Sequence, residues 1–254
     1  MNNHIDKTAI IDKSAEIGSN VVIGPYSVIH PNVKIGDNSE IRSHCVIYQD
    51  TEIGSNNKIY DNVIIGSDPQ DLKFKVNKKT FVKILENNII REHTSIHRST
   101  NENQPTKIFS NILIMANSHI GHDCIVGNNV VITNACLLGG HSMIEEYAVL
   151  GGNSLIHQNV RVGKLSMTAG GSRVSKDVIP YMLLGRNPTK HYCLNKTGLK
   201  RHGISSDDYK ILCKTFKILR KGQDITNLKP LTEDLQYLIS WFSVKSERGH
   251  YSFI

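Results

Sequence analysis

The chain has 254 residues, of which 39% are hydrophobic and 21% are charged, a composition typical of a globular protein rather than a disordered one. Its apolar runs are only a few residues long, which excludes a transmembrane helix, and no secretory signal is visible at the N-terminus. The five cysteines are scattered and form no Cys-x-x-Cys pair, which argues against a disulfide framework. We therefore expect a cytoplasmic protein.

The net charge of +7 is concentrated at one end of the chain. Residues 1–175 contain 16 Lys/Arg and 16 Asp/Glu, whereas residues 176–254 contain 14 Lys/Arg and 7 Asp/Glu. A basic region of this kind attracts an acidic protein, nucleotide phosphates, anionic lipid or nucleic acid, or only keeps the protein soluble. The charge alone does not choose between these roles.

An aliphatic residue recurs at every sixth position along most of the chain. The repeat runs from Ile11 to Ile65, resumes at Ile84, and continues from Ile108 to Val174, where Thr168 is the exception. Neither an α-helix nor an ordinary strand pair has a period of six. Three hexads form one 18-residue coil of a triangular parallel β-helix, with one aliphatic side chain per short strand pointing inward. Hexapeptide repeats of this kind resemble the left-handed β-helix family, so we predict an all-β left-handed parallel β-helix.

The repeat contains regular glycines and is interrupted twice. Glycine often follows the repeated residue, as at Gly18 and Gly36, which predicts corners where φ is positive or where backbones approach closely. The repeat is interrupted over residues 66–83 and 97–107, which predicts two functional loops on a rigid β-helix that spans residues 1–178.

Residues 179–254 predict a basic helical C-terminal domain that caps the open end of the prism. The segment after Val174 reads as a chain reversal. One helix is expected over residues 205–222, with Ser206 as N-cap and Gly222 at its end. A second helix is expected over residues 232–248, with Thr232 as N-cap. Their predicted apolar stripes are Leu212, Phe216 and Leu219 in the first and Leu235, Leu238, Ile239 and Phe242 in the second.

The repeat also predicts which polar residues meet, because residues 18 apart stack about 4.8 Å from one another on successive coils. One column beside the corner after Ile120 contains His122, Gly140 and Gln158, the next contains Asp123, His141 and Asn159, and His119 and His157 lie adjacent. A histidine beside a carboxylate is typical of a general base. The competing interpretation is a zinc ion held by histidines such as His119 and His122, although Gly140 and Gln158 follow His122 in its column.

Six segments carry a more specific signal: NSHIGHDCIVGNN, LLGGHSMI, GGNSLIHQ, SDPQDLKF, NNIIREHTSIHR and NKTGLKRHG. From residue 8 to about residue 205 the chain resembles the acyl-carrier-protein–UDP-N-acetylglucosamine O-acyltransferases, which catalyse the first acylation of lipid A biosynthesis. The resemblance implies a homotrimer with each active site in the cleft between neighbouring subunits. It also implies an acyl group delivered on the phosphopantetheine arm of acyl carrier protein, and neither a metal nor a bound cofactor.

The resemblance further implies a role for each site residue. His122 would take the proton from the 3-hydroxyl of UDP-N-acetylglucosamine, Asp123 would orient His122, and the backbone N–H of Gly140 would face the developing oxyanion. The implied substrate-binding residues are Asp71 and Lys73 for the sugar and acyl groups; His119, His141, His157 and Gln158 for the nucleotide-sugar pocket; Gly170 for an open acyl groove and so for long acyl chains; and Asn195 and Arg201 for the uridine and diphosphate. The family tends to have an acidic residue and a second arginine where this chain has Thr197 and His202, so one uridine contact and one phosphate contact are expected to differ.

Other functions remain open on the sequence. An N-acyltransferase acting on a UDP-3-amino sugar uses the same base and fold, a zinc carbonic anhydrase of the γ type shares the fold, and a non-catalytic scaffold is the remaining alternative. Acyl carrier proteins are acidic, so the basic residues of the C-terminal domain predict a docking surface for one rather than for nucleic acid. These residues are Arg201, Lys214, Lys217, Arg220 and Lys221.

Overall fold

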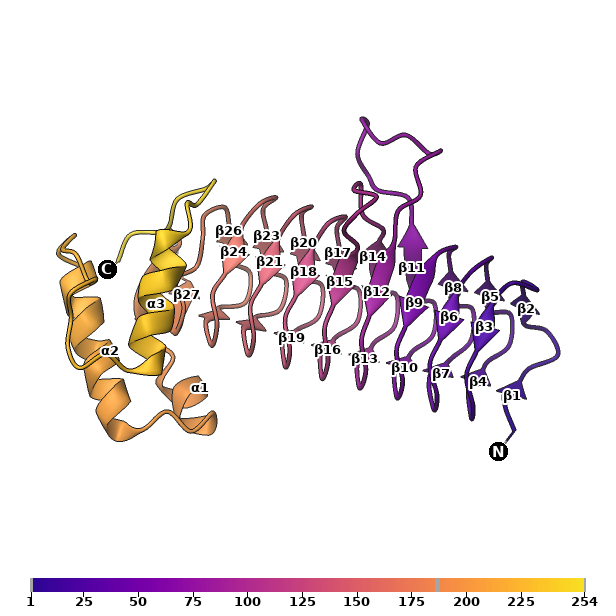
Figure 1. Cartoon of the computed structure of the whole chain (residues 1–254), viewed down its shortest axis with the longest axis horizontal. Coiled ribbons are helices and arrows are strands. Elements are labelled where there is room, and N and C mark those ends of the chain that lie inside the picture. The colour runs from indigo at the N-terminus through magenta and orange to yellow at the C-terminus, as the bar shows by residue number, and fades with distance from the viewer. Residues whose placement is uncertain (1, 186–187, 254) are drawn as a thin grey trace.

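The structure is a computed structural model that describes residues 2–185 and 188–253. The repeat folds into a long solenoid of short strands, with the N-terminus at one end and a group of helices at the other (Figure 1). The strands form three parallel sheets, one for each side of a triangular prism. This arrangement confirms the predicted fold class of a hexapeptide-repeat parallel β-helix followed by a small helical region.

Each sheet takes every third strand of the solenoid as far as β26, and the last two strands, β27 and β28, are added to the end of the first sheet. The first sheet contains β1 (His4–Ile5), β4 (Val22–Ile23), β7 (Glu40–Ile41), β10 (Lys58–Ile59), β13 (Ile89–Ile90), β16 (Leu113–Ile114), β19 (Val131–Ile132), β22 (Val149–Leu150), β25 (Met167–Thr168), β27 (Met182–Gly185) and β28 (Lys190–Leu194). The second contains β2 (Ile10–Ile11), β5 (Val28–Ile29), β8 (Val46–Ile47), β11 (Ile64–Ser67), β14 (Ser95–His97), β17 (His119–Ile120), β20 (Leu137–Leu138), β23 (Leu155–Ile156) and β26 (Arg173–Val174). The third contains β3 (Glu16–Ile17), β6 (Lys34–Ile35), β9 (Thr51–Ile53), β12 (Val82–Ile84), β15 (Thr106–Ile108), β18 (Ile125–Val126), β21 (Met143–Ile144) and β24 (Arg161–Val162).

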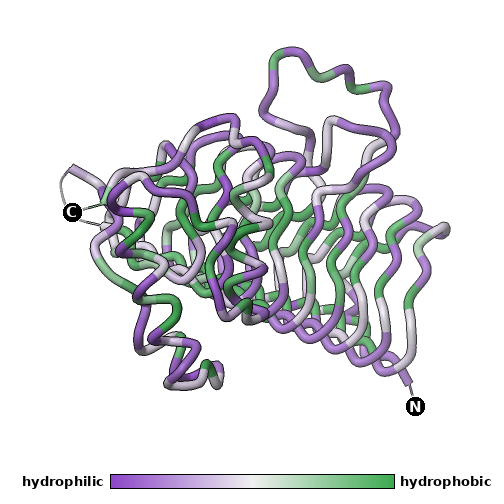
Figure 2. The backbone as a smooth tube through the Cα atoms, turned by 60° about the vertical axis from the view of Figure 1, so that its left-hand side comes forward, coloured by the Kyte–Doolittle hydropathy of each residue, from purple (hydrophilic) through white to green (hydrophobic). Residues whose placement is uncertain are grey.

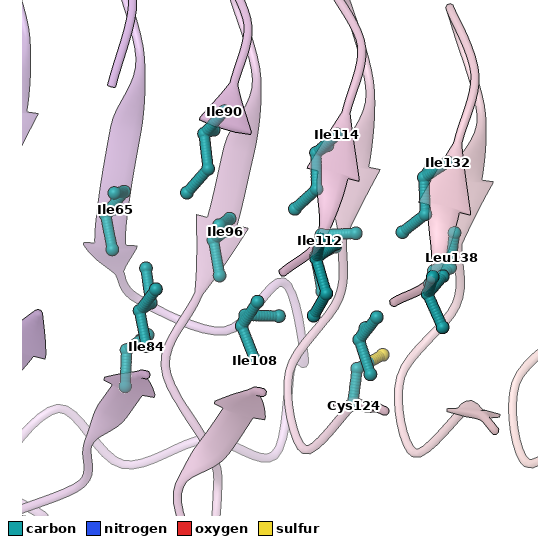
Figure 3. Packing of buried hydrophobic residues seen from close by; sticks show 14 of the residues in the cluster. Ile65, Ile84, Ile90, Ile96, Ile108, Ile112, Ile114, Cys124, Ile132 and Leu138 are labelled. Carbon is teal, nitrogen blue, oxygen red and sulfur yellow. The ribbon is translucent and has the colours of Figure 1, made fainter. Parts of the chain in front are cut away.

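The inward residues form continuous ladders through the prism. Figure 3 shows Ile90, Ile114 and Ile132 following one another along one side, all of them fully buried. Figure 2 shows hydrophobic stretches recurring along the successive coils of the chain. Burial of each such side chain contributes roughly 2 kcal/mol of apolar transfer free energy. Thr168, the polar exception, is also fully buried, and its hydroxyl accepts a hydrogen bond from the backbone N–H of Gly151 at 3.1 Å.

The number of residues between paired positions on adjacent strands shows where the two loops are inserted. Ile120 pairs with Leu138 at the regular spacing of 18, but Ile59 pairs with Ile90 and Ile96 pairs with Ile120. The first loop (residues 68–81) therefore adds 13 residues to its coil and the second (residues 98–105) adds six. Both loops are shorter than predicted, because β11, β12, β14 and β15 extend into the ranges 66–83 and 97–107. The first loop projects far from the prism (Figure 1).

Glycine and asparagine occupy different positions at the corners of the coils, for different structural reasons. A Cβ atom on Gly36 would lie 2.6 Å from the carbonyl carbon of Gly54, so glycine is required by the close approach of successive coils. Gly18 and Gly36 do not have a positive φ, which is found instead at residues such as Asn20 and Asn38, with φ of 56° and 57°. Asparagine tolerates this left-handed conformation better than most residues. Of the two predicted reasons for glycine, close approach is the correct one at these positions.

The chain reverses after the last coil, as predicted. β27 pairs in parallel with β25, and β28 then pairs antiparallel with β27. Three helices follow: α1 (Lys196–Arg201), α2 (Ser206–Leu219) and α3 (Glu233–Ser243). Asn195 caps α1, a helix that was not predicted, and Thr232 caps α3 as expected. The prediction of Ser206 as a cap was wrong by one residue, because the Ser205 hydroxyl accepts the hydrogen bond from the Asp208 N–H.

Both predicted helices were too long. α2 ends three residues before Gly222, and α3 ends at Ser243, beyond which the extended chain returns to the prism and His250 bridges to Asp177. The helices have a core of their own that includes Leu212, Phe216 and Trp241. No helix among the described residues is long and apolar enough to cross a membrane.

Candidate active site

The candidate base lies at the corner between β17 and β18. His122 is 9% exposed, and its Nδ1 atom lies 2.7 Å from Oδ2 of Asp123. Asp123 occupies the left-handed corner position with φ of 59°, a conformation that aspartate tolerates through its short polar side chain. The corner thus places the carboxylate of one residue against the imidazole of the residue before it.

Asp123 is held from two further directions by the second loop and β15. The backbone N–H of Thr100 donates to Oδ1 at 3.0 Å, and the Thr100 hydroxyl donates to Oδ2 at 2.7 Å. The backbone N–H of Asp123 donates to the hydroxyl of Thr106 at 2.8 Å. Burial alone would raise the pKa of Asp123, but the hydrogen bonds from His122 and Thr100 outweigh it and hold that pKa below its ordinary value. The carboxylate is therefore ionised at neutral pH.

Gly140 lies one coil above His122, as the 18-residue spacing predicts. A Cβ atom on Gly140 would lie 2.4 Å from Cε1 and 2.5 Å from Nε2 of His122, so no other residue fits here while the imidazole keeps its place. Within residues 2–185 and 188–253, the Gly140 N–H donates to no backbone carbonyl. It is therefore available as a donor beside the imidazole.

A cavity of about 470 Å³ opens beside this corner, on the outer side of the second sheet. It is lined by five of the predicted site residues, namely His119, His122, Gly140, His157 and Gln158. Leu137 and Leu155 form an apolar wall and are 44% and 43% exposed. The cavity thus joins a buried histidine–carboxylate pair to a surface that suits an alkyl chain.

Two further histidines are neutral at the wall of the cavity. Nδ1 of His119 lies 2.8 Å from the hydroxyl of Ser95, and Nδ1 of His97 donates to the backbone carbonyl of Asp68 at 2.6 Å. Burial, with smaller contributions from His97 and His122, lowers the pKa of His119 to about 4, and burial also lowers the pKa of His97. These imidazoles can hydrogen-bond a ligand without adding charge.

Sequence reasoning missed Gln70, His97 and Arg173, which also line the cavity, and Thr100, which binds Asp123. Three of the four lie in or beside the two interruptions of the repeat, so the interruptions were the available signal. Their positions could not be deduced, because the repeat lattice does not extend into an insertion.

Several predicted residues do not line the cavity within one chain. Asp71 and Lys73 lie in the first loop, where the Asp71 carboxylate accepts a hydrogen bond from the backbone N–H of Lys73. The side chain of Asn195 accepts from the Gly198 N–H and donates to the carbonyl of Leu165. The remaining members of this group are Arg201, exposed at the end of α1; His141, which contacts Asp123 but not the cavity; and Gly170.

Gly170 and Gly171, near the end of the repeat, differ in their surroundings. Gly171 has a φ of 71° and serves the turn, whereas a Cβ atom on Gly170 would lie 3.3 Å from the backbone oxygen of Gly152. The turn therefore does not account for glycine at position 170. His202, the departure from the family pattern, lies with its ring centroid 4.3 Å from that of Tyr147.

The residues that could hold a metal differ from those first considered. Among the described residues, His122, Asp123 and His141 place possible ligand atoms within 4.8 Å of one another. His119 is not part of this group and is hydrogen-bonded to Ser95. Because Nδ1 of His122 lies 2.7 Å from Oδ2 of Asp123, a metal bound by that nitrogen would compete with the pair.

The prism and its histidine–carboxylate corner define a transferase of the hexapeptide-repeat class, and comparisons with known proteins agree. The family model for bacterial transferase hexapeptide repeats matches residues 14–49 and 105–140, and the model for domain 2 of UDP-N-acetylglucosamine O-acyltransferase matches residues 177–251. An acyl-[acyl-carrier-protein]–UDP-N-acetylglucosamine O-acyltransferase from Syntrophobacter fumaroxidans is 46% identical over 87% of this chain and 86% of its own length.

Solved structures give the same result. The UDP-N-acetylglucosamine acyltransferase from Bacteroides fragilis matches with a TM-score of 0.91 and 34% identity over 96% of this chain and 98% of that chain. The enzyme from Campylobacter jejuni matches with a TM-score of 0.91 and 32% identity over 98% and 100%. The chain belongs to the acyl-[acyl-carrier-protein]–UDP-N-acetylglucosamine O-acyltransferase family. The predicted family and enzyme class are confirmed, and the N-acyltransferase and carbonic anhydrase alternatives are not favoured.

Proposed function

We propose that the protein transfers a 3-hydroxyacyl group from acyl carrier protein to the 3-hydroxyl of UDP-N-acetylglucosamine, the step that starts lipid A biosynthesis. The observation that carries the proposal is the His122–Asp123 pair beside Gly140 in a cavity with an apolar wall. Membership of the family supports the choice of donor and acceptor.

The proposed mechanism is general-base catalysis. Asp123 accepts the Nδ1–H of His122, which leaves Nε2 unprotonated and able to take the proton of the sugar 3-hydroxyl. The sugar oxygen then attacks the thioester carbonyl carbon, and the oxyanion that forms accepts a hydrogen bond from the Gly140 N–H. The intermediate collapses to the ester and expels the phosphopantetheine thiolate, which takes the proton from His122. No metal or bound cofactor has a role in this scheme, because the thioester is already an activated acyl donor.

The proposed active assembly is a homotrimer. Asp71, Lys73, Gly170, Asn195 and Arg201 do not line the cavity of their own chain, and a neighbouring subunit would allow them to act on the same substrate. His141, His157 and Gln158 would bind the nucleotide sugar from the coil edge. Gly170 would leave the acyl groove open, so that long acyl chains are preferred and Gly170→Met shifts the preference toward shorter ones. The proposed location of the reaction is the cytoplasm.

Replacement of the base tests the proposal. We expect His122→Ala to lower kcat by at least 10²- to 10⁴-fold, the usual contribution of a positioned base, with an unchanged melting temperature. The assay uses UDP-N-acetylglucosamine and, in parallel, the corresponding UDP-3-amino sugar. Efficient acylation of the amine alone would refute the O-acyl assignment, and full activity of His122→Ala would remove this residue from the role of base.

A further inference from the structure

The second loop delivers one residue, Thr100, to the carboxylate of the catalytic pair. Both donors of Thr100 are directed at Asp123: the backbone N–H lies 3.0 Å and 3.1 Å from its two oxygens, and the hydroxyl lies 2.7 Å from Oδ2. Oδ2 is also the atom that faces His122. The Asp123 side chain is only 9% exposed, so water does not readily replace a lost donor.

Asp123 has a second histidine within reach. Nε2 of His141 lies 3.5 Å from the same Oδ2 atom, and the rings of His122 and His141 lie edge to face with centroids 5.1 Å apart. A carboxylate in this position can pair with either imidazole, and pairing with His141 would leave the His122 tautomer unspecified. The hydrogen bonds from the two donors of Thr100 restrain the carboxylate in the orientation that pairs it with His122.

The loop itself is built to hold Thr100 in place. It adds six residues to its coil, which the regular repeat does not need, and it is fixed at its base by buried residues. Arg98 is 4% exposed and forms an ion pair with Asp68 of the first loop. Thr106, at the other end of the loop, binds the backbone N–H of Asp123. The insertion therefore binds both the backbone and the side chain of Asp123.

We propose that Thr100 is a positioning residue of the acyl transfer, which selects His122 over His141 as the partner of Asp123. The inference rests on the proposed function, since it concerns the base of that reaction. Thr100 contacts neither substrate nor the reacting atoms in this role and acts only through the carboxylate.

The test compares Thr100→Val, Thr100→Ser and Ser99→Ala in the full-length protein. Valine keeps the shape of threonine but removes the hydroxyl donor, so we expect kcat to fall by roughly 10- to 100-fold with little change in KM for UDP-N-acetylglucosamine. Serine restores the donor and should restore kcat to within about threefold of the wild type. Ser99→Ala, which disturbs the same loop without touching Asp123, should stay within about twofold.

A double-mutant cycle distinguishes positioning from loop packing. If Thr100 acts through the carboxylate, Thr100→Val should have less than about a twofold further effect on kcat in the Asp123→Ala background. Additive effects of the two substitutions, failure of serine to rescue, or an equal loss in Ser99→Ala would each overturn the proposal. Unchanged kcat in Thr100→Val would also overturn it while leaving the proposed function intact if His122→Ala is inactive. A wild-type protein without acyltransferase activity would instead refute the proposed function.

Discussion

The prism and the helical region hold their residues in place in different ways. In the prism, most neighbours are 18 positions apart, and each inward side chain repeats the environment of the one below it. In the helical region the decisive contacts join distant positions, such as Trp241 Nε1 donating to Glu145 at 3.0 Å and Tyr181 donating to Asp234 at 2.9 Å. The prism provides a rigid lattice on which catalytic groups can be placed, whereas the helical region combines a hydrophobic core of its own with polar contacts between residues far apart in the sequence.

This difference predicts that substitutions at the prism edge alter catalysis without altering stability. Gly140→Ala is the sharpest case, because the new Cβ atom would lie 2.4 Å from the His122 ring and displace it. Displacement of a catalytic group by about 1 Å costs on the order of 100-fold in rate. We expect a loss of this size in kcat and an unchanged melting temperature.

Gly152→Ala is the matched control. It is likewise the second glycine of a Gly-Gly pair at a coil corner, but its new Cβ atom would lie 3.6 Å from its nearest neighbours, the Asn134 carbonyl and the Thr133 hydroxyl. Its kcat should stay within about twofold of the wild type. Equal losses in the two variants would mean that corner rigidity, rather than space for His122, limits the rate.

The same difference explains what could be predicted from the sequence. The period of six fixes both the inward residues and the columns of outward ones, so the meeting of His122, Asp123 and Gly140 could be read from position alone. Thr100 could not, because it lies in an insertion whose path is determined by local contacts. The helix boundaries and α1 were missed for a related reason. The Asn195 side chain that caps α1 also donates to the carbonyl of Leu165, and the chain returns to Asp177 after α3, so both depend on contacts between distant segments.

A second prediction concerns the pH dependence of the helical region. His191 is fully buried, accepts a hydrogen bond at Nε2 from the Ile179 N–H and donates from Nδ1 to the Tyr251 carbonyl. Burial lowers its pKa to about 4. Between this value and the ordinary histidine pKa of about 6.5, the unfolded state binds the proton and the folded state does not, so stability falls as the pH falls.

Acidification from pH 7 to pH 5 should therefore lower the free energy of unfolding of this region by about 2 kcal/mol through His191 alone. The fluorescence of Trp241, the single tryptophan of the chain, reports the transition in urea at each pH. The slope of stability against pH should decrease in His191→Gln, whatever the absolute stability of that variant. An unchanged slope would show that other groups carry the acid sensitivity.

The smallest expected effect concerns the basic surface of α2. Lys214, Lys217 and Lys221 are exposed and lie three or four residues apart, so they share one face of the helix and its end. An acidic acyl carrier protein would be attracted to this face, and long-range attraction between proteins affects encounter more than chemistry. Reversal of all three charges to glutamate should raise KM for the acyl carrier by about 10-fold, leave kcat at saturation unchanged, and flatten the dependence of KM on salt.

The control reverses three lysines at the opposite end of the molecule. Lys7, Lys13 and Lys58 are exposed on the N-terminal coils, and their replacement by glutamate changes the net charge by the same amount. If only the α2 variant loses affinity, the basic helical region is a docking surface and the prism remains the catalytic one. If both variants lose affinity equally, net charge alone steers the carrier. If neither does and the salt dependence persists, the helical region has only a structural role, and the carrier docks on another surface.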